Sequence, residues 1–318
     1  MMILKRDIKK IDDSHFFRLS DHLDHNDVLV VNDSRVIPAR IFGRKQTGAF
    51  LEILLLTKKR ESNSAPVWEV LLRPAKRLHE KDVIFLGNNC EAEVLERISE
   101  KKWLLRFHYA GNFEDYLQNH GRAPLPPYIK RKKNYEQFND DLERYQTIYA
   151  RSPGSIAAPT AGLHFSPEVV KSLQAKGVKI ATITLHVGYG TFLPIETNDV
   201  ENHVMDFEHY EISTDAAEKI NGSKRVIAVG TTSTRTIESA ADKDGYIRPQ
   251  AGETNMFIYP GYKFKRVNGL LTNFHLPQSS LFLLVCAFAG TAFIKEAYSH
   301  AVDQRYFFYS YGDCMFID

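Results

Sequence analysis

Three histidines stand where predicted strands end or a helix begins, and histidine is the side chain that exchanges protons most readily near neutral pH. His186 ends the strand "VKIATITLHV", His275 ends "LLTNFHLP", and His164 precedes the helix start "SPE". In open α/β sheets, ligands bind beyond the carboxyl ends of the strands, where loops lead into helices. Each of these histidines is therefore either part of a ligand site or a buried residue with a structural hydrogen bond. The pattern leaves both interpretations open.

The loop "VGTTSTRTIES" (229–239) runs from an apolar strand into a helix and carries many groups that bind anions. Backbone N–H groups, hydroxyls and a guanidinium at a helix N-terminus favour a negatively charged ligand. A capped turn is the alternative, although the hydroxyls exceed what one cap needs. The loop is neither a Walker motif nor a G-x-G-x-x-G motif, so no nucleotide follows from it. The expected anion-binding residues are Thr231, Thr232, Ser233 and Arg235.

Two further loops are poor in large apolar side chains and suit a flat ligand. In "TLHVGYGTFLP" (184–194), Gly188 and Gly190 allow close backbone approach, and Tyr189 between them can stack on a ring. In "RSPGSIAAPTAGLHFSPE" (151–168), Pro159 limits flexibility and Gly162 keeps the surface low. We expect both loops to line a pocket.

Metal and hydrolase chemistry receive no support from the spacing of the residues. The histidines form no HExxH motif, and Cys90, Cys286 and Cys314 lie far apart without a CxxC pair. The chain also lacks the G-x-S-x-G elbow of serine hydrolases. We therefore expect no metal site and a reducing environment.

Basic residues are interleaved with aromatic ones in the stretches 73–81, 128–135 and 262–266. The whole chain has a formal net charge of only +2, so any nucleic acid must be held by local patches. Such stretches can follow a phosphate backbone and stack loop bases, as in RNA-binding proteins. A solvated charged face is the alternative for each of them.

Strands and helices alternate along most of the chain, which predicts an α/β fold: a mostly parallel sheet flanked by helices. Short strands without helices interrupt this alternation and predict an inserted small antiparallel β-barrel domain. We expect the α/β domain to comprise 1–59 and 141–318 and the barrel to comprise 60–140. "NMFIYPG" (255–261) and "FFYSYGDCMFI" (307–317) are further predicted strands.

The N-terminal sequence "MMILKRDIKK" lacks the features of a signal peptide, and the most apolar run, 281–293, is shorter than a membrane span. We therefore expect a soluble, cytoplasmic protein.

Taken together, the motifs resemble the S-adenosylmethionine:tRNA ribosyltransferase-isomerase family of queuosine biosynthesis. In chain order they are "NDSRVIPARIFGRK", "GRAPLPPYIKR", "ERYQTIYA", "AAPTAGLHF", "TLHVGYGTFLP", "VIAVGTTSTRTIES", "IYPGY", "LLTNFHLPQSSL" and "SYGDCMFI". The resemblance implies a two-domain protein that transfers and isomerises the ribosyl group of S-adenosylmethionine. The acceptor would be 7-aminomethyl-7-deazaguanine in the tRNA anticodon loop, and the products epoxyqueuosine-tRNA, adenine and methionine. Ahead of the part matched by "MMILKRD" the family usually has a further segment, so we expect a truncated start or a sheet that has lost an edge.

The resemblance also implies roles for individual residues, with S-adenosylmethionine as a substrate and no permanently bound cofactor. The expected catalytic residues are His164, His186, His275 and Asp313. The expected substrate-binding residues are Pro159, Thr160, Gly162, Gly188, Tyr189, Gly190, Thr231, Thr232, Ser233 and Arg235. The expected tRNA-binding residues are Arg73, Lys76, Arg77, Arg122, Lys130, Arg131 and Lys132. We expect a monomer; a nucleoside hydrolase, a base-exchanging glycosyltransferase and a non-catalytic RNA-binding protein are the alternatives.

Overall fold

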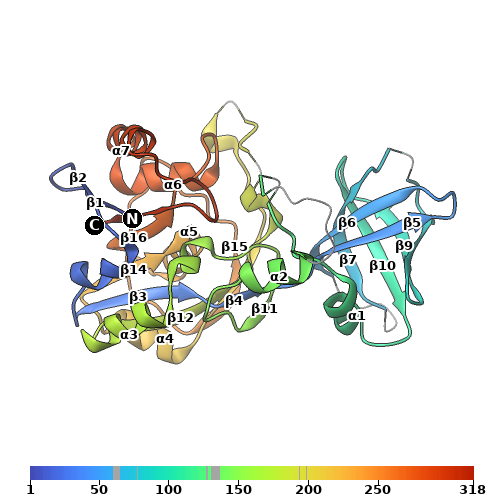
Figure 1. Ribbon diagram of the computed structural model, residues 1–318, viewed down its shortest axis with the longest axis horizontal. Coiled ribbons are helices and arrows are strands. Elements are labelled where there is room, and N and C mark those ends of the chain that lie inside the picture. Colours follow the sequence, from blue (N-terminus) through green and yellow to red (C-terminus); the bar gives the residue numbers. More distant parts are fainter. Residues whose placement is uncertain (60–64, 77, 127, 130–136, 193, 198) are drawn as a thin grey trace. The chain divides into compact units, whose positions relative to one another are not determined.

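The computed structural model describes residues 1–59, 65–76, 78–126, 128–129, 137–192, 194–197 and 199–318 (Figure 1). The contacts between residues divide the chain into two compact units. The first unit comprises Met1–Arg35, Gln146–Ser152 and Ala158–Asp318, and the second comprises Val36–Tyr145 and Pro153–Ala157.

A nine-stranded sheet with the order β15-β13-β12-β3-β14-β16-β17-β1-β2 forms the centre of the first unit. Its strands are β1 (Met2–Lys5), β2 (Lys10–Asp13), β3 (Asp27–Asn32), β12 (Lys179–Leu185), β13 (Glu208–Ile212), β14 (Arg225–Val229), β15 (Gln250–Thr254), β16 (Gly269–Asn273) and β17 (Cys314–Ile317). The neighbours β12, β3, β14 and β16 are parallel, as are β17 and β1, and the other pairs are antiparallel. The predicted α/β class is confirmed, with a mixed sheet whose parallel part is central.

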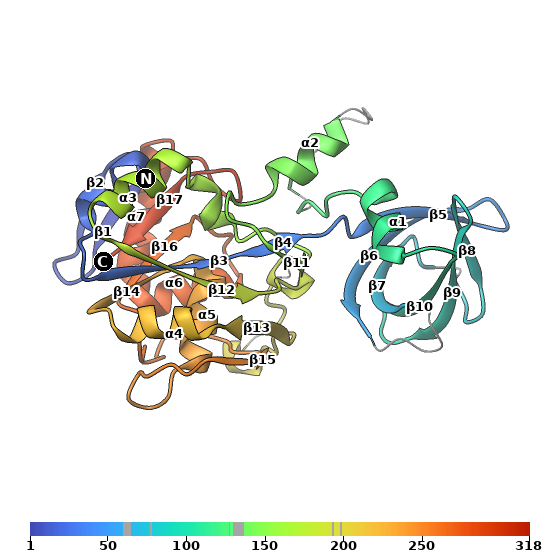
Figure 2. The ribbon, with the colours of Figure 1, turned by 90° about the horizontal axis from the view of Figure 1, so that it is seen from below.

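Helices cover both faces of this sheet, with α3 on one side and α4 and α5 on the other (Figure 2). The helical segments are η1 (Phe16–His22), η2 (Thr160–His164), α3 (Pro167–Ala175), η3 (Tyr189–Phe192), η4 (Val200–Asn202), α4 (Thr214–Asn221), α5 (Gly230–Ala240), α6 (Ser280–Ala289) and α7 (Thr291–Asp303). Alternate strand residues such as Leu29, Val31 and Val229 point to the α3 side, where they pack against Leu173. Helix α3 begins as predicted, because the Ser166 hydroxyl accepts a hydrogen bond from the Val169 N–H.

The chain near the C-terminus differs from the prediction. A strand was expected over 307–317, but β17 covers only Cys314–Ile317. The preceding residues close into a turn, because Tyr309 has a φ of 74° and the Gly312 N–H donates to the Tyr309 carbonyl at 3.1 Å. The strand predicted over 255–261 is likewise absent, and the sheet edge there is β15, at Gln250–Thr254.

The second unit contains the predicted antiparallel barrel, closed in the order β10-β7-β6-β5-β8-β9. Its elements are β5 (Arg40–Lys45), β6 (Phe50–Lys58), β7 (Val67–Arg73), β8 (Val83–Gly87), β9 (Cys90–Arg97), β10 (Lys102–Tyr109), α1 (Phe113–His120) and α2 (Gln137–Arg144). The expected boundary after residue 59 is wrong for β5 and β6, which are hydrogen-bonded in the barrel. A separate two-stranded sheet joins β4 (Ser34–Val36) to β11 (Ser152–Ser155).

Within the described part of the chain, no single helix has the length and apolar character needed to cross a membrane. Helices α6 and α7 meet that test only as a pair, which is bent by 112°.

Candidate active site

Asn273 is the last residue of β16 and connects the carboxyl end of this strand to the loop that carries His164. Its amide oxygen accepts a hydrogen bond from the Thr160 hydroxyl at 3.1 Å. Its amide nitrogen donates to the Tyr309 carbonyl at 3.2 Å and lies 3.2 Å from Nε2 of His164. A carbonyl can only accept, so these contacts fix the orientation of the amide. Nε2 of His164 is therefore the acceptor, and the neutral ring carries its proton on Nδ1.

The surroundings of His164 favour this neutral form. Its ring stacks on Phe16 with a centroid distance of 5.2 Å. Burial lowers the pKa of His164 to about 4, and the positive N-terminus acts in the same direction while Asp313 opposes it. At pH 7 this side chain is thus an uncharged hydrogen-bond donor.

His275 lies at the end of the same strand but contacts the other face of the sheet. Its Nε2 lies 2.8 Å from the Thr272 hydroxyl, and its backbone N–H donates to the Tyr298 hydroxyl at 2.8 Å. Side chains alternate along a strand, so Thr272 and Asn273 point to opposite faces. Burial lowers the pKa of His275 to about 4. The structure therefore places His164 and His275 on opposite sides of the end of β16.

His186 follows β12, which is three strand positions from β16 in the sheet. Strands are about 4.8 Å apart, so the two strand ends are separated by roughly 14 Å. The His186 backbone N–H donates to the His209 carbonyl at 3.0 Å, and the two imidazole rings are nearly parallel. Burial lowers the pKa of His186, as does the neighbouring His209. Among the described residues, Nδ1 of His186 has no hydrogen-bond partner.

Asp33 is a further candidate for the site, and it was not among the residues expected from the sequence. It follows β3, the strand between β12 and β14, and its side chain is fully buried. One carboxylate oxygen accepts from the Thr184 hydroxyl at 2.7 Å, and the other lies 3.0 Å from Nη2 of the exposed Arg151. Its charge opposes the lowering of the pKa of His186. The available signal was the polar "NDSR" that directly follows a buried strand.

Gly162 was expected to leave room for a ligand beside the loop. In the structure the space beside its Cα is filled by the side chains of Tyr149 and Thr147 from the same unit. A Cβ at this position would overlap the Tyr149 hydroxyl and lie 2.7 Å from Cγ2 of Thr147. The hydroxyls of Tyr149 and Thr147 are buried and lack hydrogen-bond partners within the described parts of the chain. Nearby, Ala161 lies 3.6 Å from the Cβ position of Gly230, so the loop crosses the carboxyl end of β14.

The expected anion loop forms the first turns of the buried helix α5. The Ser233 hydroxyl donates to the Val229 carbonyl at 2.8 Å, and Thr231 and Thr232 are also buried. The guanidinium of Arg235 pairs with the Glu208 carboxylate at 2.5 Å, and both side chains are buried. These contacts place Ser233 and Arg235 inside the unit. The Ser233 hydroxyl and Nε and Nη2 of Arg235 have protein partners, whereas Nη1 of Arg235 is buried without one among the described residues.

Glu208 also reaches the second glycine loop. Its other carboxylate oxygen accepts from the Gly188 N–H at 2.8 Å. Tyr189 is half-buried in η3, and the Cβ position of Gly190 lies 3.0 Å from Asp206. Glu208 therefore holds the start of this loop.

Two of the remaining expected residues, Pro159 and Asp313, directly precede the elements η2 and β17. Pro159 is buried and directly precedes η2. The Asp313 carboxylate accepts from the Phe307 N–H at 2.8 Å, so it closes the turn before β17.

The expected tRNA-binding residues that the structure describes belong to the second unit. Arg73 and Lys76 are exposed near the end of β7, and the Arg122 guanidinium lies 4.7 Å from the centroid of the Phe42 ring. Arg77, Lys130, Arg131 and Lys132 lie outside the described residues.

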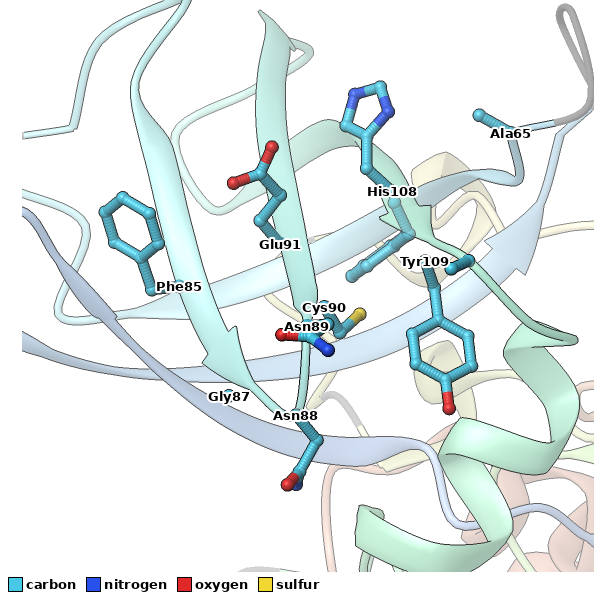
Figure 3. A pocket seen from close by; sticks show the side chains of 11 residues that line it. Ala65, Phe85, Gly87, Asn88, Asn89, Cys90, Glu91, His108 and Tyr109 are labelled. Atoms are coloured by element: carbon cyan, nitrogen blue, oxygen red, sulfur yellow. The ribbon is translucent and has the colours of Figure 1, made fainter.

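A hollow of about 750 Å³ lies on the barrel and contains none of the predicted site residues. It is lined by the Asn88–Asn89 turn and by residues of β8 to β10, and Figure 3 shows Phe85 and Tyr109 on either side of β9. Glu91 and His108, which are paired across β9 and β10, also line it. The histidines with candidate acid or base roles, His186 and His275, instead follow the carboxyl ends of strands β12 and β16 of the nine-stranded sheet.

No group of three or more His, Cys, Asp or Glu side chains in the described ranges is arranged to hold a metal ion. The three cysteines are free and buried, and burial raises the pKa of Cys90 and Cys314 to about 12.

Comparison with known proteins links the whole chain to one enzyme. A family model described as "Queuosine biosynthesis protein" matches residues 1–317. The S-adenosylmethionine:tRNA ribosyltransferase-isomerase of Syntrophus aciditrophicus is 54% identical, with 100% of this chain and 92% of the relative covered. The protein of that name from Acetivibrio thermocellus is 48% identical over the same shares. The crystal structure of S-adenosylmethionine tRNA ribosyltransferase from Thermotoga maritima is similar with a TM-score of 0.52 and 31% identity, covering 100% of this chain and 91% of that one.

Proposed function

Because the chain belongs to the queuosine biosynthesis family, we propose that it is an S-adenosylmethionine:tRNA ribosyltransferase-isomerase. It transfers and isomerises the ribosyl group of S-adenosylmethionine onto 7-aminomethyl-7-deazaguanine in the tRNA anticodon loop. The products are epoxyqueuosine-tRNA, adenine and methionine. The observation that carries this conclusion is the 54% identity to an enzyme of this name over the whole chain.

The reaction makes three demands on the site. The sulfonium acidifies the neighbouring C5′ protons, so a base can begin the reaction there. Adenine needs a proton as it leaves, and the attacking aminomethyl group must be neutral. Side chains that exchange or donate protons suit these tasks, and each such contribution is worth roughly 10²–10⁴-fold in rate.

His164 is proposed as the hydrogen-bond donor to the departing adenine. The contact with Asn273 occupies Nε2 and leaves the proton on Nδ1. The pKa of about 4 keeps the ring neutral, so it donates a hydrogen bond without bringing a charge beside the sulfonium. Thr160 supports this arrangement through its hydrogen bond to Asn273.

His186 is proposed as the base, with Asp33 beside it. Its Nδ1 has no hydrogen-bond partner in the described ranges, and its lowered pKa keeps the ring neutral at pH 7, so one ring nitrogen is free to accept a proton. The negative charge of Asp33 favours both the cationic sulfonium and the imidazolium that forms. His275, on the opposite face of the sheet end, is proposed for the aminomethyl group of the acceptor base.

The buried polar groups of α5 are proposed as positioning residues. Arg235 pairs with Glu208, and Glu208 also accepts from the Gly188 N–H, so this pair connects α5 to the loop with Tyr189 and Gly190. Tyr189 is proposed to stack on adenine or on the deazaguanine.

The tRNA is proposed to contact Arg73, Lys76, Arg77, Arg122 and Lys130–Lys132, and the protein to act as a cytoplasmic monomer. Basic side chains there suit the anticodon stem-loop, because phosphate contacts supply most of the sequence-independent affinity.

Single-turnover release of adenine tests this function. Release is expected only when both S-adenosylmethionine and tRNA carrying the aminomethyl base are present. Release of base without S-adenosylmethionine would indicate a nucleoside hydrolase, and tRNA binding without any release would indicate a non-catalytic protein. If His186→Ala and His275→Ala both leave the rate unchanged, the acid and base assignments are wrong.

A further inference from the structure

The turn formed by residues 307–313, which we call the aromatic turn, is held by backbone contacts at both ends. The Asp313 N–H donates to the Phe307 carbonyl at 2.6 Å, and the Phe307 N–H donates back to the Asp313 carboxylate. The Tyr309 N–H donates to the carbonyl of Phe274, the residue after β16. At Gly312 a Cβ would overlap the carbonyls of the turn, so the backbone is tightly wound.

Phe308 of this turn packs against Phe274 and Tyr298, but other rings on the same backbone are exposed. Phe307 is 76% exposed and Tyr311 48% exposed. Phe17 on η1 is 62% exposed, and its neighbour Phe16 stacks on His164. Burial in the hydrophobic core therefore does not account for Phe307, Tyr311 and Phe17 at these positions.

The aromatic turn is continuous with the candidate active site. Asn273 contacts both the Tyr309 carbonyl and His164. The Asp313 charge acts on His164, and the Tyr306 hydroxyl donates to Asp13, the last residue of β2, three residues before η1 begins. The exposed side chains of Arg18, on η1, and Arg305, two residues before the aromatic turn, add positive charge along these two parts of the chain.

We propose that Phe307, Tyr311 and Phe17 form a platform on which the unpaired bases beside the target nucleotide of the tRNA stack. This inference rests on the proposed function, since it names a contact of that same substrate. Bases of any identity stack on aromatic rings, and nearby cations suit the connecting phosphates. Rings exposed to this degree are suited to an extended polymer, whereas a small donor molecule is enclosed by its pocket.

The test uses an anticodon stem-loop RNA with the aminomethyl base and 2-aminopurine at the neighbouring position. Binding to the wild-type protein is expected to quench the 2-aminopurine fluorescence, because the base stacks on a ring. Phe307→Ala is expected to relieve this quenching and to raise the Kd for the RNA by about 5- to 150-fold. Phe307→Trp retains a stacking surface and is expected to retain the quenching, whereas Phe307→Leu keeps only apolar bulk and is expected to lose it.

Tyr246→Ala is the matched control, since Tyr246 is 52% exposed and lies in the turn after the last residues of α5. It should change neither the quenching nor the affinity. Equal quenching by Phe307→Ala and the wild type overturns the platform. A change of the KM for S-adenosylmethionine alone in Phe307→Ala also overturns it, because the ring would then contact adenine. Adenine release without any quenching also overturns the platform and leaves the function intact. A protein that neither binds this RNA nor releases adenine contradicts both proposals.

Discussion

The Arg235 guanidinium and the Glu208 carboxylate form an ion pair of 2.5 Å, in which the side chains are only 3% and 2% exposed. The other carboxylate oxygen accepts from the Gly188 N–H at 2.8 Å. One carboxylate thus connects helix α5 to the glycine loop that follows β12. An arrangement of this kind depends on both charges, because each is buried and compensates the other.

Glu208→Gln is expected to destabilise the protein by about 3–5 kcal/mol, since it leaves the Arg235 charge buried without a counter-charge. Urea unfolding at pH 7 measures the change in the free energy of unfolding.

Two comparisons make this prediction specific. The double variant Glu208→Gln, Arg235→Met is expected to recover much of the loss, because no uncompensated charge remains. Lys219→Met removes the exposed ion pair with Asp215 and is expected to cost less than about 1 kcal/mol. Equal effects of Glu208→Gln and Lys219→Met would show that the burial of the pair has no energetic importance.

Asn273→Asp is expected to raise the pKa of His164 from about 4. In the wild type an amide N–H faces Nε2 and favours the neutral ring, whereas a carboxylate there favours the imidazolium. NMR titration of the imidazole C–H signals measures the pKa. Asn273→Ala serves as the control, since it removes the donor without adding a charge. A pKa that stays near 4 in the Asp variant would contradict the assigned contact.

Local patterns in the sequence predicted the barrel strands, the start of α3 at Ser166 and the α/β class, because each depends on neighbouring residues. The long-range contacts of the site were not predictable in this way. The partner that fixes the His164 proton, Asn273, is 109 residues away, and Arg235 is separated from Glu208 by 27 residues. Such pairs become neighbours only through the order of the strands.

Two errors have the same physical origin. The alternation of apolar and polar residues over 307–317 resembles that of a strand. In the structure the Asp313 carboxylate accepts from the Phe307 N–H and closes a turn, and the alternation of residue types does not reveal this contact. Likewise, the strands β5 and β6 have ordinary strand sequences, and only their hydrogen bonds to β7 and β8 assign them to the barrel.

Stability is expected to fall between pH 6.5 and pH 4. The pKa values of His164 and His275 are lowered from 6.5 to about 4 by burial, so the unfolded chain binds more protons in this window. The free energy of unfolding therefore decreases as the pH falls, by at most about 1.4 kcal/mol per pH unit for each histidine. Urea midpoints at several pH values measure this slope. The double variant His164→Asn, His275→Asn is expected to show a shallower slope, and an identical slope would contradict the lowered pKa values.

Gly162→Ala is expected to destabilise the protein by about 1–3 kcal/mol, the usual cost of overpacking a filled site. The added methyl group would overlap the Tyr149 hydroxyl. Because that hydroxyl has no hydrogen-bond partner within the described residues, Tyr149→Phe removes the obstacle without breaking a bond in them. Gly162→Ala combined with Tyr149→Phe is expected to be more stable than Gly162→Ala alone in thermal unfolding. No recovery in the double variant would mean that the backbone, and not the Tyr149 contact, requires glycine.

Arg73→Ala and Lys76→Ala are each expected to weaken tRNA binding and to reduce its dependence on salt. Each lost phosphate contact lowers the slope of log Kobs against log salt by about 0.7–0.9. Both side chains are exposed, so neither change should alter the free energy of unfolding by more than about 0.5 kcal/mol.

Lys243→Ala is the control, because it removes one exposed positive charge from the other unit. Titrations of labelled tRNA between about 50 and 200 mM salt give the slopes. Charge reversal at Lys130, Arg131 and Lys132 is expected to flatten the slope further. Slopes equal to that of Lys243→Ala would remove these residues from the tRNA-binding surface.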